Sequence, residues 1–126
     1  MASNDPSAMQ DFRNLEVWRK AHAMALNTHR LVGRLRGRDT ISLRAQMLRA
    51  AMSVPANIVE GRAQTSDSQF ARFLKIALGS AIELEYHLVL AADVKAISAS
   101  DFPPFWRSHC MIACCRRRDC QAALNG

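Results

Sequence analysis

The sequence predicts an all-α fold, an antiparallel up-down four-helix bundle, and three observations carry that prediction. Apolar residues recur every three or four positions along three long segments, which is the period of helices that bury one face. No segment of useful length alternates apolar and polar residues as a half-buried strand does. Short connections join the three segments, so consecutive helices run antiparallel, and a fourth helix would complete the bundle.

The first helix is predicted from about Asn14 to Arg36. Its apolar stripe is formed by Val17, Ala21, Met24, Thr28, Leu31 and Leu35. Trp18 widens this stripe, and two glycines, Gly33 and Gly37, loosen the end of the helix. The segment Gly37–Asp39 is then expected to be a short loop.

A second helix is expected to start near Thr40 or Ser42, because either side chain can cap a helix. Its stripe is formed by Leu43, Met47, Ala51, Val54 and Ile58. Pro55 lies inside this stripe, where a proline removes one backbone hydrogen bond and crowds the preceding turn. The sequence therefore predicts a helix that is kinked at Pro55 and ends at Gly61.

The third helix is predicted to be long and to open at Ser66, where Gln69 completes a capping box. Its stripe is formed by Phe70, Phe73, Ala77, Ala81, Leu84, Leu88 and Ala91. Small residues in its middle, Gly79, Ser80 and Ala81, allow a neighbouring helix to approach closely.

The two ends of the chain do not share this pattern. Residues 1–11 are small and polar and read as a disordered lead, whereas residues 12–95 carry the three helices. In residues 96–126 the apolar period breaks down, with Pro103 and Pro104 together and three consecutive arginines at 116–118. A divergent tail is therefore expected in place of a well-packed fourth helix, from a reading-frame change or late divergence.

No residue set predicts a metal, a cofactor or an enzyme. All four cysteines, Cys110, Cys114, Cys115 and Cys120, lie in the tail, and their spacing does not match that of zinc sites. Glu83 and Glu85 lie about 200° apart on a helix, so they cannot act as a carboxylate pair. No nucleophile stands beside a base and an orienting residue. A non-enzymatic protein is the expectation.

A few polar residues in the second helix are expected to have structural roles. Asn57 can bond backbone carbonyl groups that Pro55 frees, and Glu60 can pair with Arg49 or Arg72 across helices. No run of apolar residues is long enough to span a membrane, and no secretory signal is visible, so a cytoplasmic protein is expected.

The charge is concentrated in one third of the chain. The net formal charge is +6, and residues 13–49 hold nine arginines and lysines against Glu16 and Asp39. The candidate nucleic-acid-binding residues are Arg30, Arg34, Arg36, Arg38, Arg44 and Arg49. Arginine binds phosphate oxygens in pairs, which favours RNA or DNA as partner. Phe12 and Trp18 are the nearest aromatic residues in the sequence, so backbone contacts are expected rather than base stacking.

The same concentration of charge is compatible with two roles besides nucleic-acid binding. The arginines can form a solvated surface only, or they can hold an acidic protein in an oligomeric adaptor. Self-association is expected because Leu78, Ile82, Val89 and Leu90 are apolar and lie outside the main stripe of the third helix.

Three blocks of the sequence are more specific than a generic bundle. They are L-E-V-W-R-K-A at 15–21, Q-M-L-R-A-A-M-S-V-P-A-N-I-V-E-G at 46–61 and F-A-R-F-L-K-I-A-L-G-S-A-I-E-L-E at 70–85. In order and without gaps, they resemble the blocks of the four-helix-bundle family also called 23S rRNA-intervening-sequence proteins. The resemblance covers roughly residues 12–95 and ends near Ala96.

The resemblance implies a small homo-oligomer, typically a pentameric ring of four-helix subunits, with no enzymatic activity. A related accessory protein of diversity-generating retroelements forms a basic pentameric barrel and binds nucleic acid. By this resemblance the structural residues of the fold are Trp18, Pro55, Asn57, Glu60, Gly61, Phe70, Phe73, Gly79, Ser80, Glu83 and Glu85.

Overall fold

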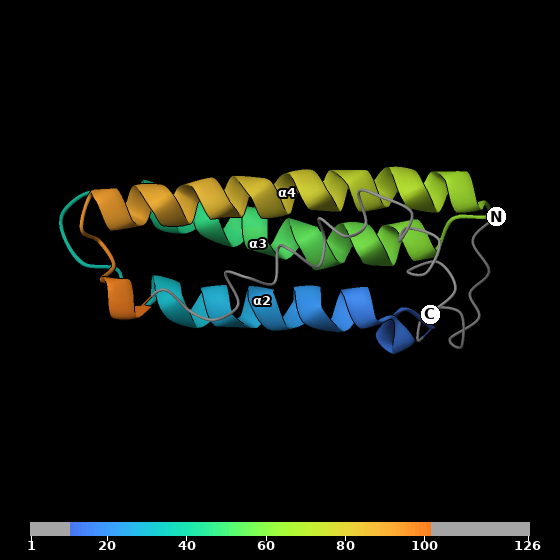
Figure 1. Cartoon of the computed structure of the whole chain (residues 1–126), viewed down its shortest axis with the longest axis horizontal. Helices are drawn as coiled ribbons and strands as arrows, with labels where there is room; N and C mark the ends of the chain where they lie inside the picture. The colour runs from blue at the N-terminus through green and yellow to red at the C-terminus, as the bar shows by residue number, and fades with distance from the viewer. Residues whose placement is uncertain (1–10, 102–126) are drawn as a thin grey trace.

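Three long helices lie side by side in the computed structural model, which describes residues 11–101 of the 126-residue chain. They are α2 (Glu16–Val32), α3 (Ile41–Arg62) and α4 (Asp67–Asp93). Short 3-10 turns, η1 (Asp11–Asn14) and η2 (Ala99–Asp101), flank them, and the described part of the chain contains no strand. Figure 1 shows the three helices antiparallel in sequence order, with α3 packed against both of the others. The all-α prediction is confirmed.

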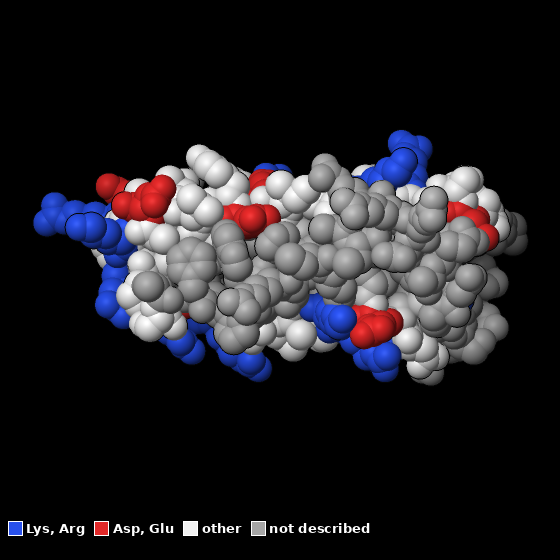
Figure 2. Space-filling model, viewed as in Figure 1, with Lys and Arg blue, Asp and Glu red and all other residues white. Residues whose placement is uncertain are grey.

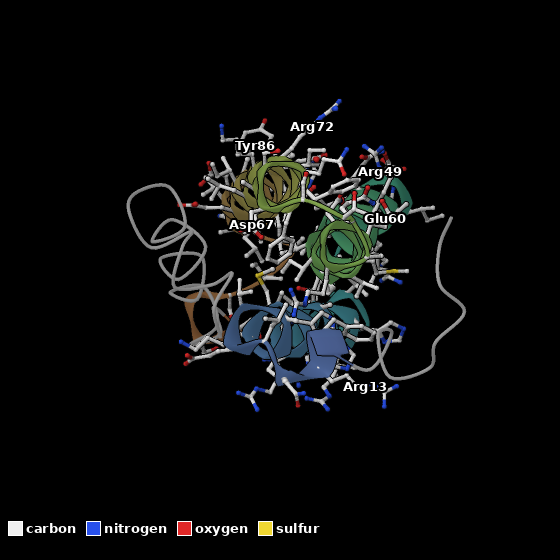
Figure 3. The ribbon with its side chains drawn as sticks, turned by 90° about the vertical axis from the view of Figure 1, so that its right-hand side faces the viewer. Arg13, Arg49, Glu60, Asp67, Arg72 and Tyr86 are labelled. Atoms are coloured by element: carbon white, nitrogen blue, oxygen red, sulfur yellow. The ribbon has the colours of Figure 1, made fainter. Side chains whose placement is uncertain are left out.

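The predicted apolar stripes form the core. On α2 and α3 the side chains of Ala21, Met47, Val54 and Ile58 are fully buried or nearly so. On α4 every residue of the predicted stripe is buried except Phe73, which is half-buried. The neighbouring Leu74, which is not part of the predicted stripe, is buried instead. The end-on view of Figure 3 shows the side chains of the three helices meeting between the ribbons.

The first helix is shorter than predicted, because it ends at Val32 rather than near Arg36. The loop is correspondingly longer and contains two residues with left-handed backbone, Gly37 (φ 97°) and Asp39 (φ 61°). Leu35 is still buried in this loop, and the backbone N–H of Arg36 donates to the carbonyl oxygen of Ala96 at 3.0 Å. These contacts connect the loop to the segment after α4.

The second helix begins after Thr40, which occupies the capping position without a side-chain hydrogen bond to the helix. The helix is continuous across Pro55 and ends at Arg62, one residue later than predicted. The amide of Asn57 donates to the carbonyl oxygen of Ser53 at 2.8 Å. It thus bonds a backbone carbonyl in this region, although the carbonyl that loses its helical donor to Pro55 is that of Ala51. The kink at Pro55 stays a prediction.

The entry to α4 is well defined. Ser66 Oγ accepts a hydrogen bond from the backbone N–H of Gln69 at 3.3 Å, which is one of the two bonds of the predicted capping box. Gly61 lies against the first turns of α4, where an added Cβ would come within 2.7 Å of Phe73 Cβ and 2.8 Å of Phe70 Cδ2. A glycine is therefore required there by the close approach of α3 to α4.

The divergent tail is predicted for residues 96–126, and its first residues, Ala96 and Ile97, are buried in the core. Residues 102–126 of the tail and residues 1–10 of the lead lie outside the described residues. Within residues 11–101, none of the helices combines the length and the apolar character needed to cross a membrane.

Candidate nucleic-acid interface

Four arginines gather at one end of the helices, where α2 ends and α3 begins. They are Arg30, Arg34, Arg36 and Arg38, all exposed, and we call this cluster the basic end. In the space-filling view this end lies at the left, where blue arginine and lysine side chains extend from the molecule (Figure 2). Arg30 lies in the last turn of α2 and donates to Asn27 Oδ1 at 3.2 Å. Its charge also complements the carbonyl groups at the helix C-terminus.

The basic end contains one ion pair with an acidic residue. Arg36 Nη2 lies 3.8 Å from Asp101 Oδ2, and the Arg36 side chain remains 70% exposed. Hydrogen bonds from the backbone N–H and hydroxyl of Ser98, together with the charge of Arg36, lower the pKa of Asp101. Arg34 and Arg38 form no ion pair within residues 11–101. Their guanidinium groups are available to an external anion.

The other two arginines of the predicted set lie elsewhere. Arg44 is half-buried, and its Nη2 donates to the carbonyl oxygen of Leu35 at 3.0 Å. Arg49 lies farther along α3, where its Nη2 contacts Gln46 Oε1 at 3.0 Å and Glu83 Oε1 at 3.5 Å. The structure therefore brings four of the six predicted arginines together and gives the other two partners within the bundle.

The predicted pairing of Glu60 with an arginine is not observed among the described residues. Glu60 is exposed and pairs with neither Arg49 nor Arg72. Glu60 lies eleven residues after Arg49, about 16 Å along the same helix, and Arg72 points outward from α4 (Figure 3). Arg49 pairs with Glu83 instead, because Glu83 lies on the side of α4 that faces α3. Glu85, two residues on, is half-buried.

Small residues permit a close contact between α3 and α4, as predicted for this stretch of the third helix. The hydroxyl oxygens of Ser53 and Ser80 are 2.8 Å apart, and Ser53 Oγ also accepts from Asn57 Nδ2 at 2.9 Å. Ala81 is buried beside them, whereas Gly79 is exposed and an added Cβ there would meet no atom within 4 Å. The close approach uses Ser80 and Ala81 but not Gly79.

Trp18 is half-buried at the opposite end of α2 from the basic end. Its ring stacks on His22 at 4.8 Å between centroids and meets Phe12 edge-on at 4.9 Å. Trp18 and Phe12 are therefore engaged with each other and lie far from the arginine cluster along α2.

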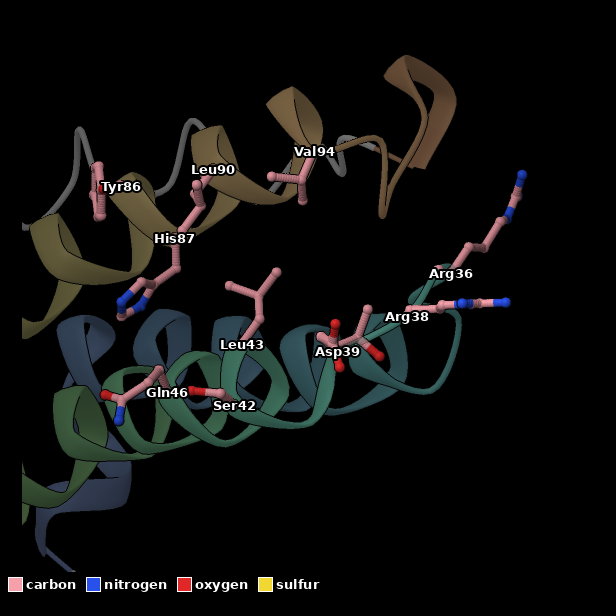
Figure 4. A pocket seen from close by; sticks show the side chains of 12 residues that line it. Arg36, Arg38, Asp39, Ser42, Leu43, Gln46, Tyr86, His87, Leu90 and Val94 are labelled. Atoms are coloured by element: carbon pink, nitrogen blue, oxygen red, sulfur yellow. The ribbon is translucent and has the colours of Figure 1, made fainter.

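Sequence reasoning missed two aromatic residues beside the basic end, Tyr86 and His87 of α4. They line a cleft of about 480 Å³ between the start of α3 and the end of α4. Its other walls are residues 36–40 of the loop, Ser42, Leu43 and Gln46 of α3, and Leu90 and Val94. Figure 4 shows His87 extending from α4 toward α3 on the side of Gln46. The antiparallel order of the helices could have revealed this, because it places the last turns of α4 beside the first turns of α3.

No group of three or more possible metal ligands occurs among the residues that the structure describes. All four cysteines, and His109 near them, lie outside that range.

Comparison with known proteins identifies the family. The model of the family described as 23S rRNA-intervening sequence protein matches residues 13–109. The match extends beyond Ala96, where the resemblance seen in the sequence blocks ends. A search of the curated proteins found no match. Since the family match spans most of the 126 residues, the chain belongs to the family of 23S rRNA-intervening sequence proteins.

Proposed function

We propose that this chain is a non-enzymatic, self-assembling helical protein that binds the backbone of RNA or DNA through its basic end. One observation carries the proposal, namely that four arginines are exposed together at one end of the helices. The proposed partners are other copies of the chain and a nucleic acid, with no cofactor.

The chemistry of the basic end suits phosphate. Each guanidinium presents a planar set of donors that can hold two phosphate oxygens, and each remains charged at any physiological pH. Only Arg36 of the four has an acidic partner within the described residues. Contacts of this kind follow the sugar–phosphate backbone, so binding should depend weakly on base sequence and strongly on salt.

Assembly would multiply these contacts. The family resemblance implies a pentameric ring of four-helix subunits, and we propose that state here. Ile76 and Ile82 support self-association because they are apolar and 45% and 44% exposed on α4, in the turns before Tyr86.

A binding measurement with a matched control tests the proposal. We would titrate a fluorescent single-stranded RNA and a DNA duplex with the parent chain and with the Arg34→Ala/Arg36→Ala/Arg38→Ala variant, and follow anisotropy. A control variant, Arg19→Ala/Arg72→Ala/Lys75→Ala, removes the same charge from exposed positions away from the basic end. We expect only the first variant to lose affinity, by a similar factor for every sequence.

Two results would contradict the proposal. Equal losses of affinity in the two triple variants would show that binding depends on the net charge of the chain and not on the basic end. Absence of RNA and DNA binding, combined with binding of an acidic polyglutamate peptide that depends on the basic end, would favour the adaptor function instead.

A further inference from the structure

The cleft beside the basic end has the composition of a site for a small ligand. Its volume of about 480 Å³ lies within the range of roughly 300–1,000 Å³ that ligand pockets occupy. Its walls come from α3 and α4, which the Ser53–Ser80 hydrogen bond and the Arg49–Glu83 pair hold together farther along. The cleft therefore lies on regular helices whose relative position is fixed by side-chain contacts.

The interior of the cleft combines apolar surfaces with polar groups that have bonding capacity to spare. Leu43 and Leu90 supply apolar surface from opposite helices. Tyr86, which points away from α3 in Figure 4, adds a 61% exposed aromatic ring at the outer edge of the cleft. His87 Nδ1 is buried and has no hydrogen-bond partner among the described residues. The side-chain oxygen of Gln46 already accepts from Arg49, which leaves the amide N–H groups of Gln46 to donate to a ligand.

The rim of the cleft is basic. Arg36 and Arg38 belong to its lining and extend toward solvent beyond its outer end, next to Asp39 (Figure 4). The first turn of α3 also lies there, with no side-chain cap from Thr40 and no acidic residue. Two carboxylates, Asp39 and the Arg36 partner Asp101, offset part of this charge. The preference of the rim for an anion therefore rests on the unpaired, exposed Arg38, with Arg34 nearby, and on the free N–H groups of this turn.

These features together describe a ligand with a flat polar ring and an attached phosphate. Leu43, Leu90 and the Tyr86 ring would contact the faces of the ring, and Gln46 and His87 would bond its edge. The phosphate would remain at the rim with Arg36 and Arg38. We propose that the cleft takes an unpaired base of a single-stranded nucleic acid whose backbone lies on the basic end.

This inference rests on the proposed function and changes one expectation from the sequence, that bases would not be contacted. Base stacking on an aromatic ring tolerates any base, because each base has a π-face. A cleft of this kind therefore adds affinity for single strands without requiring a defined sequence, and a duplex cannot use it because its bases are paired.

The decisive comparison is between two strands that differ only in their bases. We would measure anisotropy with the full chain and two twelve-nucleotide DNA strands, one ordinary and one composed entirely of abasic sites with the same phosphates. The parent should bind the ordinary strand about tenfold more tightly. That advantage should persist as salt is raised, because stacking does not release counterions.

Variants of the cleft show which residues cause the tighter binding of the ordinary strand. Tyr86→Ala removes the exposed ring, and Leu90→Ala removes one apolar wall of the cleft. Each variant should lower the preference for the ordinary strand and leave affinity for the abasic strand unchanged. Met52→Ala is a matched control, since Met52 is 60% exposed and does not line the cleft. Methyl NMR spectra of the parent give a readout that needs no variant, because Leu43 and Leu90 should shift with the ordinary strand only.

The outcomes separate this inference from the proposed function. Equal affinity of the parent for both strands would overturn the base-binding cleft while leaving backbone binding in place. An advantage that survives in both cleft variants would also overturn it. If neither strand bound, the proposed function itself would fail. A nucleoside 5′-monophosphate that competes away only the advantage of the ordinary strand would support the inference.

Discussion

Arg44 Nη2 donates a hydrogen bond to the main-chain carbonyl oxygen of Leu35 at 3.0 Å, and so connects the first turn of α3 to the loop that follows α2. Leu35 is itself 6% exposed. Two contacts of Leu35 therefore hold the loop: its side chain is buried, and its carbonyl oxygen accepts a charge-assisted hydrogen bond. The arginines of this region thus fall into two kinds, with Arg44 supporting the loop and Arg34, Arg36 and Arg38 exposed on it.

Arg44→Ala should destabilise the fold, whereas Arg34→Ala should not. Loss of this part-buried hydrogen bond from a charged donor costs about 1.5–3 kcal/mol, and an exposed substitution changes stability by less than about 0.5 kcal/mol. Urea unfolding followed by circular dichroism measures both. Equal stabilities for the two variants would show that the Arg44–Leu35 bond does not hold the loop.

Gly61→Ala should destabilise the contact between α3 and α4. The added methyl group would lie within 2.8 Å of both Phe70 and Phe73, and overpacking of this kind costs roughly 1–3 kcal/mol. Gly79→Ala is the matched control, because the space around Gly79 is open and alanine is the better helix former, by up to about 1 kcal/mol. The same unfolding measurement should show opposite signs for the two variants. A gain in stability for Gly61→Ala would contradict the close approach.

Asp101 should make the fold sensitive to acid. The hydrogen bonds from Ser98, and then the charge of Arg36, lower the pKa of Asp101 in the folded state. The folded chain therefore holds this proton less tightly than the unfolded chain, in which the pKa is about 3.9. The stabilising contribution is present above that value and is lost as the pH falls through the lowered pKa. Between about pH 5 and about pH 3, the Tm of the parent should fall more than that of Asp101→Asn. Equal decreases in Tm for the parent and for Asp101→Asn would contradict this role of Asp101.

Ile82→Lys should weaken self-assembly, because it places a charge on the exposed apolar face of α4 that we propose as a contact between copies. Leu26→Lys is the control, since Leu26 on α2 is 45% exposed against 44% for Ile82. Light scattering should give the parent and Leu26→Lys the mass of five 14.0 kDa chains, about 70 kDa, and Ile82→Lys a smaller mass. A parent that stays at 14.0 kDa at micromolar concentration would exclude assembly.

The helices were predictable from the sequence because their apolar periods are long and regular. The stripe through Met47, Val54 and Ile58 continues across Pro55, and the structure shows one helix there. Helix ends were less predictable. Leu35 extends the apolar period of α2 but is buried from a loop, because the bond to Arg44 and the contact of Arg36 with Ala96 hold the chain in place without a helix.

The candidate site was predictable only in part. Charge density along the chain identifies the arginines at 30–38, but it cannot separate exposed side chains from Arg44 and Arg49, whose partners lie in other elements. Tyr86 and His87 were missed for the same reason. They are about fifty residues from the arginine loop in sequence and reach it only through the antiparallel packing of α4 on α3.

The salt dependence of binding tests the central claim most directly. For the parent and the Arg34→Ala/Arg36→Ala/Arg38→Ala variant, the dissociation constant for single-stranded RNA would be measured across a series of salt concentrations. Each phosphate contact contributes about 0.7 to the slope of log K against log salt concentration for a single strand, so loss of three contacts should reduce the slope by about 2. The basic end predicts that reduction, with the Arg19→Ala/Arg72→Ala/Lys75→Ala control keeping the slope of the parent. An unchanged slope in the first variant would contradict the assignment of nucleic-acid binding to this end.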